Sequence, residues 1–395
     1  QCLKRLARRE RRLRVLEARD VVRFLERLGL EHQLVSPPSI PPLGGLSGIV
    51  PPDPPRGRIA LAVPDHTRPL PLRDVLRVLE PLLNRATLIF ATGTHSMTVE
   101  EAVRLLGPYA GRVSFKVHDC RGIHKYVGAT SRGLQVEVDS TFVEADFRVT
   151  VGLVAPHPWA GFSGGSKVVL PGLSSQRTIV EHHVRWYEEG RPAVVEGNPF
   201  REEIDEAGRL AGVDWALNLV LDGDGRVVYA AAGEPQSSFR ACVEVAERLY
   251  VRDVDGPFDS AVVFADPLDI DFYQATKALE HAAPVVAEGG SIVLVAGCRQ
   301  GVGDGEFQRY LEMGREELLE HVRGGRAGNI VPAIVALKLK EIAEAYNVTL
   351  LTRAEVSIPQ VSLTRDPLTA LSRLKGRVLV LARGGFTVPR LRHGE

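Results

Sequence analysis

Apolar runs that end abruptly in polar residues recur along the first half of the chain. Helical stretches, such as residues 72–83 and 99–106, separate these runs. Strands that alternate with helices are the pattern of a mainly parallel sheet, so we expect a doubly wound α/β domain from Arg58 onward. The predicted strands are residues 58–63, 86–91, 112–117 and 147–154.

A second alternation of the same kind fills the last third of the chain. Asp, Gly and Pro at residues 253–258 interrupt the expected helix 239–251 and mark a domain boundary. Before that boundary, residues 205–211 suggest a short helix, and Asp222-Gly223-Asp224-Gly225 suggests the turn of a hairpin. The predicted strands beyond it are residues 260–265, 291–296, 348–351 and 377–381, with helices at 314–322 and 334–345.

The N-terminus has a different character. Residues 2–30 combine spaced leucines with many arginines and predict a basic helix, and the Pro- and Gly-rich residues 37–55 form a connector that cannot be helical. We therefore divide the chain into the helix and connector at 1–57, a cofactor-binding and catalytic domain at 58–255, and a C-terminal domain at 256–395. The fold class is α/β, with two mainly parallel sheets flanked by helices and an active site in the cleft between the domains.

The amino-acid composition argues against several classes of function. The 395 residues are 44% hydrophobic and 25% charged, with a formal net charge of zero, so nothing favours nucleic acid as a partner. No apolar run approaches the roughly 18 to 20 residues that span a bilayer, so we expect no membrane segment and a cytoplasmic location. The four cysteines are far apart, which argues against a zinc ribbon or a disulfide framework.

Polar clusters follow each predicted strand of the first domain. Because parallel strands place their carboxyl ends at one edge of the sheet, we expect these clusters to converge on one site. They are Asp65-His66-Thr67-Arg68, Thr92-Gly93-Thr94-His95, His118-Asp119-Cys120 and the segment from His157 to Lys167.

Lys167 follows glycines, but it does not belong to a phosphate loop. Residues 168–172, Val-Val-Leu-Pro-Gly, predict extended chain and a turn where a phosphate loop would open a helix. His95 and His157 each follow a strand, and histidine can give and take a proton near neutral pH. Two such bases on opposite walls of a cleft would suit inversion at a carbon centre.

The adjacent His182 and His183 lie on a predicted helix that begins near Ser174. Their side chains diverge by about 100°, so at most one can face a given metal, and residue type alone leaves the choice open. Arg68 could bind a carboxylate or a phosphate through two hydrogen bonds, or it could form a surface ion pair with Asp65. In the second domain, Gln274 and Lys277 lie three apart on one face of a predicted helix.

Taken together, these segments resemble the nickel-pincer lactate racemase family, which comprises racemases and epimerases of 2-hydroxy acids. The resemblance covers about residues 58–385. The motifs that carry it are Asp65-x-Thr67-Arg68-Pro69, Gly93-Thr94-His95, His157-x-x-Ala160-Gly161-Phe162-Ser163-Gly164-Gly165-x-Lys167, Pro171-Gly172, His183 and Tyr273-Gln274-x-x-Lys277.

The resemblance implies a nickel complex of pyridinium-3,5-bisthiocarboxylic acid mononucleotide, made by cofactor-synthesis enzymes and joined covalently to Lys167. His183 would ligate the nickel, and Asp65, His66, Thr67 and Arg68 would hold the cofactor. His95 and His157 would act as acid and base while the cofactor takes a hydride reversibly from lactate or a related 2-hydroxy acid. Gln274 and Lys277 would bind the substrate.

Two other interpretations use the same residues. A metal-free enzyme could employ Lys167 as a Schiff-base nucleophile on a carboxylate substrate. A non-catalytic protein could bind a carboxylate or nucleotide through Arg68 and Lys277.

Overall fold

The computed structural model describes residues 16–392, apart from 39, 42, 44, 54, 55 and 325–328. Their contacts form two compact units. The N-terminal unit comprises Pro38–Val251 and Glu316–Ile334, and the C-terminal unit comprises Arg252–Arg315 with the described parts of Gln1–Pro37 and Val335–Glu395. Each unit is built on its own six-stranded sheet.

The sheet of the N-terminal unit has the strand order β12-β11-β7-β2-β3-β4. All neighbouring strands are parallel except β11 and β12, which form the hairpin predicted around Asp222-Gly223-Asp224-Gly225. The strands are β2 (Ile59–Pro64), β3 (Ala86–Ala91), β4 (Ser114–Val117), β7 (Phe147–Leu153), β11 (Trp215–Leu221) and β12 (Val227–Gly233).

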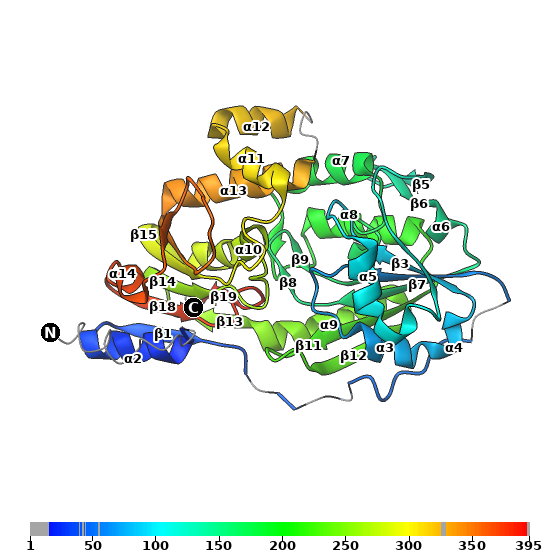
Figure 1. Ribbon diagram of the computed structural model, residues 1–395, viewed down its shortest axis with the longest axis horizontal. Helices are drawn as coiled ribbons and strands as arrows, with labels where there is room; N and C mark the ends of the chain where they lie inside the picture. Colours follow the sequence, from blue (N-terminus) through cyan, green and yellow to red (C-terminus); the bar gives the residue numbers. More distant parts are fainter. Residues whose placement is uncertain are drawn as a thin grey trace. The chain divides into compact units, whose positions relative to one another are not determined.

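Helices pack against this sheet because its strands are apolar on both faces. One core joins Leu61, Leu88 and Val149 of the strands to Leu72, Val75 and Leu76 of α3 (Leu72–Val78) and Leu106 of α5 (Val99–Leu106). Helix α9 (Pro235–Tyr250) packs against β11 and β12 (Figure 1). Two small sheets, β5 (His124–Ala129) with β6 (Gln135–Asp139), and β8 (Pro156–His157) with β9 (Ala160–Phe162) and β10 (Arg191–Pro192), complete the unit. Its other helical segments include α4 (Glu80–Leu83), α6 (Ser140–Val143), η2 (Gly165–Val168), α7 (Gln176–Trp186) and α8 (Pro199–Leu210).

The sheet of the C-terminal unit is parallel throughout, in the order β1-β18-β14-β15-β16-β17. This confirms the α/β class with a mainly parallel sheet in each half of the chain. The strands are β1 (His32–Val35), β14 (Phe258–Phe264), β15 (Val286–Val295), β16 (Asn347–Leu351), β17 (Ser362–Thr364) and β18 (Val378–Leu381). This half of the chain also contains the strand pair β13 (Val251–Val254) and β19 (Val388–Leu391) and the helices α10 (Phe272–Ala282), α11 (Gly305–Glu312), α12 (Arg315–Arg323), α13 (Ile330–Ala345) and α14 (Pro367–Leu371). Most of α12 and the first residues of α13 belong to the N-terminal unit.

Of the basic helix predicted at residues 2–30, the first part lies outside the described residues. In the described part, Glu17 is extended, and α2 (Ala18–Leu28) begins after it and ends at Gly29, whose φ is 67°. Strand β1 follows and pairs with β18. Val21, Phe24 and Leu25 of α2 pack into a core with Val262, Val378 and Val380, so this segment joins the C-terminal unit through its apolar face.

Three local predictions were wrong or incomplete. Residues 168–172 are not extended, because the chain from Gly165 makes a 3-10 turn that continues as further turns. Helix α8 begins at Pro199, six residues before the predicted start, since Asn198 caps it and Pro199 occupies its first turn. The β5–β6 hairpin and the short strand β17 were not predicted.

No helix in the described ranges combines the length and apolar character that a bilayer crossing requires.

Candidate functional site

A small cavity lies where β2, β3 and β7 end. Its lining includes Asp65 and Arg68 from the loop after β2, His95 after β3, and Lys167 from the Gly-rich loop after β7. Three of the four predicted polar clusters therefore converge. At about 80 Å³, the cavity is well below the roughly 300–1,000 Å³ of pockets that enclose whole ligands, so it would take only one end of a nucleotide-sized group.

Asp65 and His95 form a hydrogen-bonded pair in this cavity. The carboxylate of Asp65, only 4% exposed, lies 2.8 Å from Nδ1 of His95 and also accepts hydrogen bonds from the backbone N–H and hydroxyl of Thr67. Burial alone would raise the pKa of Asp65, but His95, Arg68 and Thr67 outweigh it and lower that pKa below its ordinary value. An ionised Asp65 accepts from Nδ1–H, so neutral His95 carries its lone pair on Nε2 and can accept a proton there.

Arg68 is tied to the same pair. Its Nη1 donates to Oγ1 of Thr67 at 3.0 Å, and that hydroxyl donates to Asp65. The loop therefore places the Arg68 guanidinium beside the cavity, and the backbone of Arg68 is held in a short turn. Such a group suits a carboxylate or a phosphate.

The Gly-rich loop that carries Lys167 is packed tightly between the sheet and two helices. The N–H of Gly165 donates to Asn218 Oδ1 of β11 at 2.9 Å, and the Ser166 hydroxyl accepts from Gln236 of α9. A Cβ on Gly208 of α8 would collide with the Ser166 side chain. This packing leaves the loop little freedom and fixes where Lys167 enters the cavity.

Lys167 is half-buried, and its surroundings disfavour its charge. Burial, and then the nearby guanidinium groups of Arg68 and Arg201, lower the pKa of Lys167 to about 7. About half of its amines are therefore neutral near pH 7, where an ordinary lysine is almost wholly protonated. A neutral amine is the nucleophilic form.

His157 precedes the loop that lines this cavity and is not itself among the lining residues. Its ring forms a cluster with those of Trp159 and His183. Its Nδ1 accepts hydrogen bonds from the backbone N–H groups of Trp159 and Ala160, both at 3.2 Å. The ring of Trp159 lies 6.2 Å from that of His157 and 6.0 Å from that of His183. With Nδ1 as the acceptor, neutral His157 carries its proton on Nε2, the opposite arrangement to His95.

His182 and His183 are distinguished by their hydrogen bonds. Nε2 of His182 lies 3.0 Å from the carbonyl oxygen of Phe200 and Nδ1 of His183 lies 2.9 Å from that of Ile179, so each of these nitrogens must be the donor. The lone pair of His182 then faces His183, 3.4 Å between Nδ1 atoms, whereas that of His183 is on Nε2. Burial lowers the pKa of His182 to about 3 and that of His183 well below 6.5, so both rings are neutral.

The cluster after β4 has a different role from the one predicted. The side chain of His118 is fully buried and bonds to Asp139 and to the carbonyl oxygen of Ser174, so it braces the turn before α7 and does not line the cavity. His66 also lies outside the cavity lining, and its buried Nδ1 has no hydrogen-bond partner in the described part of the chain.

Gln274 and Lys277 belong to α10 of the C-terminal unit. Asp271 caps this helix by accepting from the N–H of Gln274, and the Lys277 amine donates to Gln274 Oε1. The predicted spacing on one helix face is therefore present. Their role in substrate binding stays a prediction.

Gly161 shows how closely the chain packs around His157. Its φ is 69°, and a Cβ there would collide with the carbonyl oxygen of Val194. Gly197 has a similar φ of 72° but open space around it. We expect Gly161→Ala to destabilise the protein by about 1–3 kcal/mol more than Gly197→Ala, because both variants pay for positive φ but only the first is overpacked. Urea unfolding followed by tryptophan fluorescence measures this difference, and equal losses would contradict the packing described.

Sequence reasoning missed Arg201, whose fully buried side chain hydrogen-bonds to the carbonyl oxygens of Phe162 and Gly164. The signal was present: Asn198-Pro199 is a strong helix start, and Arg201 falls on the same helix face as the apolar Ile204 and the buried Gly208. An arginine on a buried face is unusual and implies specific acceptors.

The fold and the cavity define a class: an α/β protein of two units, in which ionisable side chains and a half-buried lysine meet at the carboxyl ends of parallel strands. Comparison with known proteins narrows this class. Residues 53–193 match the family domain described as the lactate racemase N-terminal domain, and residues 262–331 match the lactate racemase C-terminal domain. The chain belongs to the lactate racemase family.

Individual relatives agree with this assignment. The lactate racemase of Thermoanaerobacterium thermosaccharolyticum is 30% identical over 275 residues, 65% of this chain and 64% of that protein. The lactate racemase of Lactiplantibacillus plantarum is 30% identical over 268 residues, 64% of this chain and 63% of that protein. The chain thus matches slightly less than two thirds of the length of these curated relatives.

Solved structures share the fold. That of the lactate racemase apoprotein from Thermoanaerobacterium thermosaccharolyticum has a TM-score of 0.78 and 24% sequence identity, covering 88% of this chain and 91% of that one. A protein from Thermotoga maritima has a TM-score of 0.63 and 19% identity, covering 95% and 99% of the two chains. These likenesses extend the agreement in fold over nearly the whole chain.

Proposed function

We propose that the protein is a racemase or epimerase of a 2-hydroxy acid, lactate or a close relative, that uses a nickel-pincer nucleotide bound through Lys167. The observation that carries this proposal is the meeting of Asp65, Arg68, His95 and Lys167 around one cavity in a member of this family. The relatives named above are lactate racemases, which makes lactate the first substrate to test.

The residues present fit such a cofactor. Lys167 offers a partly neutral amine for a covalent bond, and His183 offers a neutral imidazole whose lone pair is on Nε2. Arg68 suits an anionic group, and the buried Nδ1 of His66 has no partner among the described residues. No three His, Cys, Asp or Glu side chains in the described ranges are grouped to hold a metal by themselves. A nickel ion on His183 would therefore draw its remaining ligands from the cofactor.

When bound, the cofactor would supply a reversible acceptor for the hydride on the α-carbon of the substrate. The chain's own task is to move the hydroxyl proton. Nε2 of His95 accepts it, and the resulting imidazolium is stabilised by the ionised Asp65 behind it. In the reverse direction His95 returns the proton to the same oxygen.

His157 would act from the other side of the substrate. With Nδ1 accepting from two backbone N–H groups, neutral His157 carries its proton on Nε2 and would donate from there to the substrate oxygen. The two histidines thus begin a turnover in complementary states, one an acceptor and the other a donor. Gln274 and Lys277 would hold the substrate carboxylate and hydroxyl groups.

Lys167 should react with amine reagents at unusually low pH. Acetylation by acetic anhydride, quantified for each lysine by peptide mapping, is expected to rise with pH through a midpoint near 7, because only the neutral amine reacts. Solvent-exposed lysines in the same sample provide the reference, with midpoints near 10.4. A midpoint for Lys167 that matches theirs would contradict the proposed attachment chemistry.

The same lowered pKa supports a second candidate, a metal-free enzyme in which Lys167 forms a Schiff base with a carbonyl substrate. Borohydride would then trap a substrate adduct on Lys167 in nickel-free protein. Trapping without nickel would favour this candidate, and its absence would favour the racemase.

A further inference from the structure

The start of helix α8 contacts three segments that carry proposed functional residues, those of His157, Lys167 and His183. The Asn198 side chain donates to the carbonyl oxygen of Trp159 at 2.9 Å, next to His157, and the carbonyl oxygen of Phe200 accepts from His182, next to His183. Arg201 reaches the Gly-rich loop. This helix lies beyond residues 53–193, which match the N-terminal family domain.

The guanidinium of Arg201 is fully buried yet well satisfied. Nη1 donates to the carbonyl oxygens of Phe162 and Gly164 at 3.1 and 3.3 Å, and Nε and Nη2 donate to the carboxylate of Asp205 at 3.0 and 2.6 Å. The ring of Phe239 lies 3.7 Å away and covers its face. A buried charge is costly unless it is paired in this way, so a simpler packing residue would serve stability at least as well.

The contacts of Arg201 determine the path of the loop. Gly164 and Gly165 both have positive φ, 78° and 55°, and a Cβ on Gly165 would lie within 2.8 Å of both Nη2 of Arg201 and the Phe239 ring. The loop therefore rests directly on the guanidinium. Lys167 follows two residues later, within the 3-10 turn that starts at Gly165.

We propose that Arg201, anchored by Asp205, is a positioning residue. It holds the Gly-rich loop so that Lys167 enters the cavity with two fixed guanidinium groups nearby, those of Arg68 and Arg201. The inference rests on the proposed function in that Lys167 is taken as the attachment residue. The ionisable groups around Lys167 are Arg68 from the loop after β2, Arg201 from α8, and His182 and His183 from α7, with Asp65 and His95 lining the same cavity.

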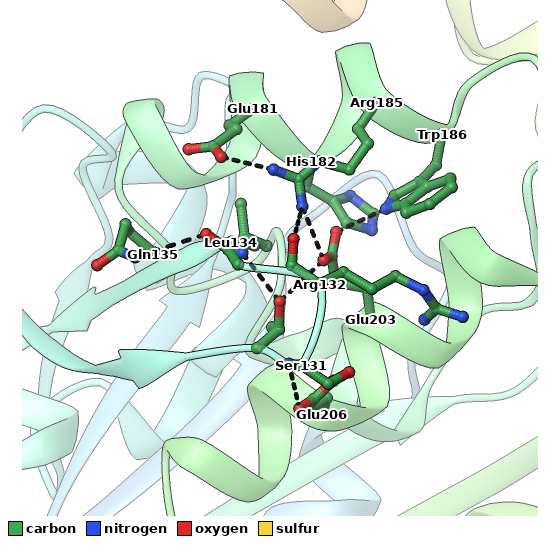
Figure 2. A network of polar contacts seen from close by, with 12 residues as sticks. Ser131, Arg132, Leu134, Gln135, Glu181, His182, Arg185, Trp186, Glu203 and Glu206 are labelled. Atoms are coloured by element: carbon green, nitrogen blue, oxygen red, sulfur yellow. Dashed lines mark hydrogen bonds and ion pairs between the residues drawn. The ribbon is translucent and has the colours of Figure 1, made fainter.

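Glu203 provides a matched control on the same helix. Its fully buried carboxylate accepts from Thr130 Oγ1 at 2.9 Å, Arg185 Nη1 at 3.2 Å and Trp186 Nε1 at 2.7 Å. Figure 2 shows Arg185 and Trp186 beside Glu203. Within the described residues, these bonds go to α7 and to the turn between β5 and β6. Glu203→Gln thus weakens a buried ionic network of α8 without touching the Gly-rich loop.

The test is the pH profile of Lys167 acetylation in Arg201→Gln, Arg201→Lys, Asp205→Asn and Glu203→Gln. The reagent is acetic anhydride, which transfers an acetyl group to the amine and releases acetate and a proton. We expect the midpoint to rise by about half a pH unit or more in Arg201→Gln, because one neighbouring cation is lost and the loop loosens. Arg201→Lys keeps the charge and should recover part of the shift, and Glu203→Gln should leave the midpoint unchanged.

An unchanged midpoint in folded Arg201→Gln, or an equal rise in Glu203→Gln, would overturn the proposal. If Arg201→Gln does not fold, Asp205→Asn decides. Loss of an anion by itself would lower the midpoint, so a higher midpoint shows that the loop has loosened and supports the positioning role, whereas an unchanged or lower midpoint refutes it. The labelling needs no cofactor. The two proposals can therefore fail separately. If the acetylation midpoints of Lys167 shift as expected but the protein gains no nickel adduct, the positioning role of Arg201 stands and the racemase proposal fails.

Discussion

His95→Ala is expected to lower kcat for racemisation by at least about 10²- to 10⁴-fold while leaving bound nickel unchanged. The loss follows from the proposed mechanism, in which the imidazole paired with Asp65 accepts the hydroxyl proton, because general base catalysis of this kind contributes factors of that size. Nickel stays because His95 is not assigned as a ligand. Chiral chromatography of the product and metal analysis of the same protein sample measure the two quantities.

His157→Ala should also abolish most activity, and glutamine substitutions separate the two histidines. A glutamine amide can replace the Nε2–H donor of His157 but cannot replace the proton acceptor of His95, so His157→Gln should retain more activity than His95→Gln. His321→Ala, on the surface of α12, is the control and should behave like the parent. Full activity in both alanine variants would refute the acid–base assignment, and equal residual activity in the two glutamine variants would refute the division of roles.

Lys167→Ala is expected to eliminate the covalent cofactor adduct, and with it all racemisation. The amine is the only part of the side chain that can form the bond, so Lys167→Arg, which keeps a cation, should lose the adduct equally. Intact-mass spectrometry of protein produced together with cofactor-synthesis enzymes detects the adduct, and peptide mapping locates it. Lys125→Ala, which removes an exposed lysine paired with Glu144, should leave the adduct in place.

His183→Ala gives the complementary result. The adduct on Lys167 should persist, while nickel content falls at least about tenfold, because the variant would lose the proposed metal ligand but keep the proposed attachment point. An adduct that survives Lys167→Ala, or nickel that survives His183→Ala, would show that these residues have been assigned the wrong roles.

The sequence predicted the parts of the fold that depend on strand patterns. A short and mainly apolar run such as residues 86–91 favours a buried strand, and β3 has those bounds. Hydrophobic periodicity says less about what a segment packs against, so it could not show that α2 and β1 join the C-terminal unit. Nor could it show that residues 168–170 continue a 3-10 turn, because that conformation depends on packing against α8 and α9.

For the site, the order of strands was enough to bring Asp65, His95 and Lys167 together. It could not separate His118 from them, since a polar residue after a strand has the same sequence pattern whether it lines a cavity or braces a turn. The choice between His182 and His183 also required hydrogen-bond partners, which lie at Phe200 and Ile179. Arg201 was missed because the predicted helix began at residue 205, which left Arg201 off its buried face, and because two of its acceptors are backbone carbonyl groups, which no sequence motif marks.

The most direct test of the central claim is to follow lactate labelled with deuterium at the α-carbon, using nickel-loaded protein with the Lys167 adduct. Starting from either isomer, the account predicts an approach to an equal mixture of the two, with deuterium retained on the α-carbon, because the hydrogen leaves and returns as a hydride and is not exchanged with water. Unchanged lactate and unchanged related 2-hydroxy acids would contradict the claim. Racemisation with loss of the deuterium to water would contradict the hydride mechanism and indicate removal of the α-hydrogen as a proton.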